Sequence, residues 1–157
     1  MKLPLTRFLS AAAVLLAVWL TLACTPMKSN AQIGIHNGRL APCPSTPNCV
    51  SSEAGDESHR IEPFRIASDS RLFWETLRQT IADRPRTRIV TVTEDYLHAE
   101  EKSRIFGFVD DIEFHLRPSE GIAAVRSASR TGRSDLGVNR KRVEAIRSEL
   151  KRRGVVR

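Results

Sequence analysis

The second half of the chain begins with a helical spacing of apolar residues and continues with a strand-like one. In the segment RLFWETLRQTIADRP, Phe73, Leu77 and Ile81 fall on one helical face, and Pro85 closes the pattern. This spacing predicts an amphipathic helix that ends at the proline. A region with a period of two follows it directly.

Four segments of that region, separated by short polar breaks, are predicted to be strands: 88–95, 96–103, 105–118 and 121–129. The third alternates without a slip, which predicts one shared strand face for Phe106, Phe108, Asp110, Ile112, Phe114 and Leu116. The turn signal at 118–121 joins the last two segments. We therefore expect an antiparallel meander with one face covered by helices.

The chain closes on a second helical pattern, NRKRVEAIRSELKRRG. Its apolar stripe is Val143, Ile146 and Leu150, Asn139 is suited to cap its start, and Gly154 is suited to stop it. The predicted fold class is α+β: a meander of about four strands, with an N-terminal-side helix and a C-terminal helix packed on one face.

The N-terminus is typical of a secretory signal. Lys2 and Arg7 precede the apolar run 9–23, and that run of about 15 residues is short of the roughly 20 that cross a bilayer. TLAC, which ends at Cys24, resembles a bacterial lipobox with Thr21 in the place of the usual leucine. We expect residues 1–23 to be removed and Cys24 to be lipidated with palmitate-type chains.

An alternative cleavage site lies before Gln32, after the A-x-A-like end SNA. The number of cysteines favours cleavage at the lipobox over cleavage before Gln32. Cys43 and Cys49 in CPSTPNC are natural disulfide partners in an oxidising compartment, which leaves Cys24 as the odd thiol. A metal site that joins this pair to His36 or His59 fits no familiar zinc spacing.

The domain boundaries follow from the same patterns. Residues 24–40 lack periodicity and are predicted to be a linker, and residues 43–64 are rich in Pro, Ser and Gly and are predicted to be loop. Residues 41–157 then form a single α+β domain.

Positive charge is concentrated at the C-terminal end of the chain. The formal net charge is +7. Residues 121–157 hold eleven Lys and Arg against three acids, or +8, while residues 24–120 hold twelve against fifteen, or −3. In an exported protein this distribution favours an anionic lipid, a glycan or an envelope protein as partner over nucleic acid, with membrane contact through the lipid anchor. The pattern indicates no oligomeric state.

The odd residue on the predicted apolar strand face is Asp110. A buried carboxylate must be paired, and the next strand offers Arg126 and Arg130 on one side. In a structural interpretation one of these arginines pairs with Asp110 or Asp111 across the hairpin. A bulge at Asp110 would instead turn both aspartates outward.

In a functional interpretation, the stretch RSASRTGRSDLGVNR binds an anionic group at the N-terminus of the last helix, where free N–H groups favour an anion. The candidate binding residues are Arg126, Ser127, Ser129, Arg130, Arg133, Asp135, Asn139 and Arg140.

Catalysis has weaker support, and the chain is interpreted as a non-enzyme more readily than as an enzyme. A hydrolase or transferase would use Asp110, Asp111, Glu113 and Arg126. A regular strand, however, points Asp110 and Glu113 to opposite faces. Asp111, Glu113 and His115 share a face suited to a metal, but a solvated strand face has the same pattern. No metal or cofactor is predicted, and a purely structural assembly module is the third hypothesis.

Three ordered blocks, CPSTPNCVSS, FGFVDDIEF and RSASRTGRSDLGVNRKRVEAIR, resemble the bacterial and plastid domain-of-unknown-function family number 1499. The resemblance runs from Ala41 to Leu150. It implies a small α+β domain that is exported or membrane-linked, and it implies no established activity. The leading expectation is an envelope lipoprotein that binds an anionic ligand or partner through the arginine-rich loop.

Overall fold

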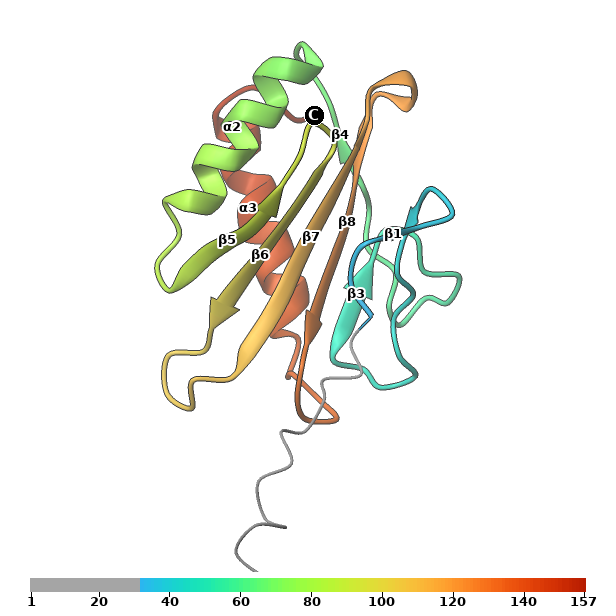
Figure 1. Ribbon diagram of the computed structural model, residues 1–157, viewed down its shortest axis with the longest axis vertical. Coiled ribbons are helices and arrows are strands. Elements are labelled where there is room, and N and C mark those ends of the chain that lie inside the picture. Colours follow the sequence, from blue (N-terminus) through green and yellow to red (C-terminus); the bar gives the residue numbers. More distant parts are fainter. Residues whose placement is uncertain (1–31) are drawn as a thin grey trace, which may run out of the picture.

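An antiparallel sheet of six strands organises residues 32–157, which are the residues that the computed structural model describes (Figure 1). The strands run in the order β3-β8-β7-β6-β5, and β4 also pairs with β8. Their bounds are β3 Cys49–Ser51, β4 Phe64–Arg65, β5 Thr87–Val92, β6 Tyr96–Lys102, β7 Val109–Arg117 and β8 Ile122–Ser129. A separate two-stranded ribbon joins β1 (Ile35–His36) to β2 (Arg39–Leu40).

The predicted four-strand meander is confirmed as β5 to β8. The turn between β7 and β8 is the short 3-10 helix η2 (Pro118–Glu120), closed by Gly121 at a positive φ of 64°. The prediction that residues 43–64 are all loop was wrong, because β3 lies within them and β4 begins at Phe64. Both are only two or three residues long, and the partner that makes them strands is β8.

Both predicted helices are present: α2 (Ser70–Ala82) and α3 (Val138–Arg152). Asp69 caps α2 by accepting the backbone N–H groups of Arg71 and Leu72. The expected Asn139 cap of α3 was wrong, since the N-cap position is Gly137 in the left-handed region and Asn139 lies inside the first turn.

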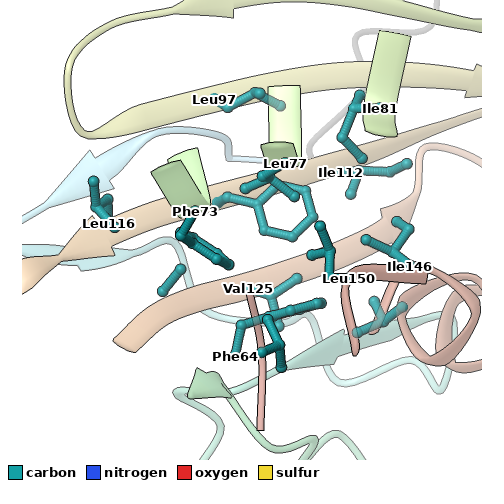
Figure 2. Close-up of a cluster of buried hydrophobic side chains, with 14 of the residues drawn as sticks. Phe64, Phe73, Leu77, Ile81, Leu97, Ile112, Leu116, Val125, Ile146 and Leu150 are labelled. Atoms are coloured by element: carbon teal, nitrogen blue, oxygen red, sulfur yellow. The ribbon is translucent and has the colours of Figure 1, made fainter. Parts of the chain in front are cut away.

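The hydrophobic core lies between the two helices and one face of the sheet (Figure 2). Phe64 and Phe114 meet there edge to face, with ring centroids 5.5 Å apart. The helices and the strands both contribute side chains to this core, and those labelled in Figure 2 are Phe64, Phe73, Leu77, Ile81, Leu97, Ile112, Leu116, Val125, Ile146 and Leu150. This is the helix face of the sheet, and its apolar pattern is the one that the alternation in β7 predicts.

The alternation breaks down at the start of that segment. Phe106 and Phe108 were expected on the strand but are exposed in the β6–β7 loop, because β7 begins only at Val109. The chain reverses there, with Gly107 at a φ of 67° and the N–H of Ser103 bonded to the carbonyl of Phe108.

The opposite face of the sheet, called here the polar face, is covered by the N-terminal part of the described chain. The backbone N–H of Gly34 donates to Glu113 on β7, and Arg117 donates to the carbonyl of Gly38. The predicted disulfide between Cys43 and Cys49 is confirmed and ties this covering segment to β3. None of the helices within residues 32–157 has the length and apolar character that spanning a membrane requires.

Candidate functional site

The helix face carries a buried polar network that fastens α3 to the sheet. Asp110 pairs with Arg142 of α3 at 2.5 Å, and the Arg142 Nε lies 3.1 Å from a Glu101 carboxylate oxygen. Asp110 is therefore paired, as its apolar surroundings require. Of the pairings that the sequence left open, those of Asp110 with Arg126 or Arg130 do not form, because these two arginines pair with Glu113 and Asp111 on the other face.

Asn139 completes this network. Its side-chain oxygen accepts hydrogen bonds from Ser127 (2.6 Å) and Arg142 (2.5 Å), and its Nδ2 donates to the carbonyl of Asn48 and to the hydroxyl of Ser129. Asn139 is fully buried. Ser127 and Asn139, expected as ligand contacts, thus hold α3 against β8 and β3.

The polar face carries a second buried network, centred on Glu113. The Glu113 carboxylate accepts hydrogen bonds from Arg126 Nη1 (2.7 Å), the Tyr96 hydroxyl (2.8 Å) and the N–H of Gly34 (2.6 Å). Burial first, and then the negative charge of Glu113, raise the pKa of Tyr96 well above its usual range. Tyr96 is therefore a neutral donor that holds Glu113.

Asp111 lies beside Glu113 on the same face and is also fully engaged. It accepts two hydrogen bonds from Arg130, at 2.7 and 2.9 Å, and one from His98 Nε2 at 2.7 Å. A carboxylate only accepts, so Nε2 of His98 carries the hydrogen. Arg130 also reaches Glu100, which binds Arg88 on its outer side. The expected pairing of Arg130 with Asp111 is confirmed.

The charges of this cluster reinforce one another. Burial alone would raise the pKa of Asp111, but the hydrogen bonds from His98 and Arg130 outweigh it and hold that pKa below the usual value. The bond to Asp111 in turn raises the pKa of Arg130. Arg130 is therefore a fixed cation whose position is set by two carboxylates.

A cavity of about 640 Å³ opens over these arginines at the end of β8. We call it the arginine cavity. Its floor comes from β8 and the residues that follow it, and its wall from the disulfide-closed loop. The lining residues are Gln32, Pro42, Cys43, Pro44, Thr46, Asn48, Arg126, Ala128, Ser129, Arg130 and Gly132. Among residues 32–157, two guanidinium groups and no carboxylate line it.

Arg126 is the least expected member of that lining. Its side chain is 1% exposed, yet it borders an open cavity. Within residues 32–157, Glu113 is its hydrogen-bond partner, and no acceptor reaches its buried Nε. Arg130 uses its Nε and Nη2 on acids, and Nη1 has no hydrogen-bond acceptor in the same part of the chain.

The structure divides the eight predicted binding residues. Arg126, Ser129 and Arg130 line the cavity, whereas Ser127 and Asn139 lie in the helix-face network. Asp135 accepts the N–H groups of Gly137 and Asn139, so it occupies the helix N-terminus that the sequence had left for an anion.

Arg140 and Arg133 complete the set. Arg140 donates to the carbonyls of Arg60 and Ser58, which fixes the covering segment, and Arg133 is exposed to solvent.

The four candidate catalytic residues are also divided. Asp110 faces the helices, while Asp111, Glu113 and Arg126 face the other way, as their places on β7 and β8 dictate. In the described part of the chain no three His, Cys, Asp or Glu residues are grouped to hold a metal. His115 shares the face of Asp111 but contacts Arg117.

Several residues of the site were not predicted from the sequence. Asn48 and Thr46 come from a segment predicted to be plain loop, and Asn48 donates to the carbonyl of Gly132 at 2.6 Å. His98 and Tyr96 carried a usable signal, because alternation along β6 places both on the face opposite Leu97. The pairing of β6 with β7, and so their partners, was not readable from either strand alone.

Comparison with known proteins identifies a family for the chain but no function. The family model described as a protein of unknown function, DUF1499, matches residues 39–150. The chain belongs to the DUF1499 family. The matched range holds β2 through nearly all of α3, so both networks and most of the cavity lining lie within the DUF1499 domain. No curated protein and no solved structure matches the chain.

The helix-face network predicts a large loss of stability for Arg142→Ala. The substitution leaves Asp110 and Glu101 without their cation, and an uncompensated buried charge destabilises a fold by about 3–5 kcal/mol. Urea unfolding followed by circular dichroism measures the change. Arg152→Ala, on the exposed side of the same helix, is the matched control and should stay close to wild type. An Arg142→Ala chain as stable as that control would contradict the assigned role.

The lowered pKa values of two carboxylates on the polar face predict that the fold loses stability in acid. Asp111 and Glu100 both have a lowered pKa, so each stabilises the fold above its unfolded-state value and loses that contribution as the pH falls through the folded-state value. The free energy of unfolding should therefore fall most steeply below about pH 4. Asp111→Asn should be less stable at neutral pH and lose less between pH 5 and pH 3. Parallel pH profiles for both chains would contradict this.

Proposed function

We propose that this DUF1499 chain is an exported lipoprotein of the bacterial cell envelope, and that its domain binds the phosphate or carboxylate group of a ligand in the arginine cavity. The domain acts as a binding module in this proposal, and the lipid on Cys24 keeps it at the membrane. The proposal has a binding half and a localisation half, which rest on different features and are tested separately.

The observation that carries the binding half is the unsatisfied guanidinium of Arg126. Three buried arginine nitrogens lack a hydrogen-bond acceptor in the described chain: the Nε atoms of Arg78, Arg126 and Arg142. Arg142 has Glu101 at 3.1 Å, and Arg78 has a side chain that is 43% exposed and pairs with Glu75. The side chain of Arg126 is 1% exposed but borders a cavity, and a buried donor left unpaired is destabilising. An anion in the cavity would add a partner to this guanidinium.

The electrostatic arrangement supports the same conclusion. Glu113 and Asp111 lie behind the arginines and hold them in place, while the cavity itself is lined by the cations. An entering anion therefore meets donors whose positions are already fixed, which lowers the entropic cost of binding. Arg130, partly exposed, faces the ligand as the accessible charge.

This site differs from the one that the sequence suggested. The N–H groups at the start of α3 bond to Asp135, so the helix terminus does not supply the anion site. The cavity site keeps Arg126, Ser129 and Arg130 from the original set. It adds Asn48 and Thr46 from the disulfide-closed loop as the facing wall.

The alternative functions fit the geometry less well. A hydrolase built on Asp110, Asp111 and Glu113 would need acids that approach a substrate together, whereas the sheet separates Asp110 from the other two and arginines occupy all three. A purely structural module predicts no pocket, and the arginine cavity is present.

The localisation half rests on the signal-like N-terminus and on the cysteines. Because Cys43 and Cys49 are bridged, Cys24 is the remaining cysteine of the chain. A disulfide is typical of an exported protein. Residues 1–31, which hold the signal and Cys24, lie outside the described residues.

Inorganic phosphate should bind in the cavity and perturb its lining. We expect saturable NMR shifts of the backbone amides of Ser129, Arg130 and Gly132 on phosphate titration, at constant ionic strength set with chloride. Arg130→Gln should weaken binding about tenfold, since it removes a charge-assisted contact. Arg133→Ala, in the same loop but outside the cavity, is the matched control.

A second variant isolates Arg126. In the double substitution Arg126→Gln/Glu113→Gln the buried ion pair is replaced by two amides, so the fold keeps a neutral pair while the cavity loses its buried cation. Phosphate affinity should fall in this chain too. Shifts centred on Arg133, or equal affinity in all four chains, would contradict the cavity site.

Mass spectrometry of the mature chain from bacterial membranes tests the anchor. The expected product starts at Cys24 with a diacyl or triacyl modification and with Cys43 and Cys49 bridged. Cys24→Ser should abolish the modification. A product that starts at Gln32 would make the chain an unanchored exported protein. This result would contradict the lipid anchor of the localisation half and leave the binding half unaffected.

A further inference from the structure

Two loops at one end of the sheet expose large apolar side chains. The β6–β7 loop spans 103–108 and the β8–α3 loop spans 130–137, and both lie at the end of the sheet drawn lowest in Figure 1. The N–H of Arg130, the first residue of the second loop, donates to the carbonyl of Val109, which directly follows the first loop. We call this end of the molecule the loop end.

The loop end carries the most exposed apolar residues of the described chain. Ile105, Phe106 and Leu136 are exposed to 82%, 74% and 86%, and no other large apolar side chain in residues 32–157 exceeds 57%. Phe106 and Phe108 stack on each other with centroids 5.5 Å apart. Single exposed apolar residues are ordinary, but a set of them gathered on two adjoining loops marks a contact surface.

Basic residues surround these side chains. Lys102 directly precedes the first loop, Arg104 lies within it, and Arg133 lies in the second. None of these three forms an ion pair within residues 32–157, in contrast to most arginines of α3 and β8. Apolar and aromatic side chains beside unpaired basic ones suit the interface of an anionic bilayer, where the rings enter the headgroup region and the cations meet lipid phosphates.

The chain also enters the domain at this end. Gln32, the first described residue, lines the arginine cavity together with Arg130 and Gly132. Seven residues separate it from Cys24, which follows the apolar run 9–23. Even a fully extended segment of that length spans only roughly 30 Å. An attachment in that N-terminal stretch therefore brings the loop end, rather than the β7–β8 turn, toward the membrane.

We propose that the loop end docks on the anionic bilayer surface, with Ile105, Phe106, Phe108 and Leu136 inserted at the headgroup level. The four inserted side chains do not line the arginine cavity, but the second loop borders it at Arg130 and Gly132, so docking turns the cavity toward the lipid headgroups. The proposal needs an N-terminal attachment of the proposed kind, and it does not need an anion in the cavity. Its failure and the failure of phosphate binding are therefore distinguishable.

Photo-crosslinking of the full chain to lipid tests the docking. The chain is reconstituted in vesicles of phosphatidylcholine with about 30% phosphatidylglycerol and a phospholipid that carries a diazirine in its acyl chain, and crosslinked residues are mapped by mass spectrometry. We expect crosslinks in 103–108 and 131–138. Leu72, an exposed apolar residue outside the two loops, gives the baseline.

Matched variants separate insertion from chance contact. Phe106→Asp/Phe108→Asp alters only exposed side chains, so the fold should be retained, and crosslinks at 131–138 should drop severalfold. Leu72→Asp should leave them unchanged. Arg104→Gln should reduce them roughly fivefold in the anionic vesicles, because each basic residue near such a surface favours docking by about that factor.

The outcomes are decisive in either direction. Crosslinks confined to the two loops, and lost in the aspartate variant, support docking. Equal labelling at Leu72, or no labelling of the loops, overturns it. In a parallel sample without the lipid probe, Leu136→photo-leucine carries the diazirine on the chain itself. Crosslinks from this residue to another copy of the chain identify that copy as the occupant and overturn the proposal as well.

Discussion

Strand β7 sends buried carboxylates to both faces of the sheet, and the rest of the structure is arranged to neutralise them. Asp110 faces the helices, and Asp111 and Glu113 face the N-terminal covering segment. A buried carboxylate without a partner would destabilise the fold or take up a proton. Each acid therefore requires a nearby arginine, and the three partners are Arg142, Arg130 and Arg126.

This requirement explains the basic C-terminal end. Residues 121–157 carry a net charge of +8, yet many of their arginines serve the fold. Arg147, for example, lies 4.4 Å from the ring centroid of Phe64 and donates to the carbonyls of Glu62 and Pro63. Charge counted along the sequence thus overstates the charge that is free to meet a partner. Exposed positions such as Arg133 are the ones available to a partner surface.

Local periodicity predicted the elements that generate it. The meander and both helices follow from repeated apolar positions, and the pairing of Arg130 with Asp111 follows from a hairpin with a clear turn. Strands β3 and β4 were missed because two or three residues carry no period, and their pairing with β8 is a long-range event. The apolar alternation also begins before the true start of β7 at Val109, which placed Phe106 and Phe108 wrongly in the core.

The candidate site was predictable only where it coincides with β8. Arg126, Ser129 and Arg130 were identified because one dense stretch holds all three. The partner of Asp110 was not, because it depends on how α3 is rotated against the sheet, and an amphipathic stripe does not specify which polar residue at its edge meets a buried acid. Asn139 shows the same limit: its type suits a cap, while its position requires a buried network.

The two faces of the sheet therefore have different consequences for function. On the helix face the acid of β7 is enclosed by an arginine, an asparagine and a serine, and the Arg142 Nε, which has no hydrogen-bond acceptor in the described chain, lies 3.1 Å from a Glu101 oxygen; such a network fixes the position of α3. On the polar face the corresponding arginine keeps a donor unpaired beside an open cavity. Arg126 differs from Arg142 because it borders the arginine cavity, and this difference supports our proposal that the polar face, rather than the helix face, binds a ligand.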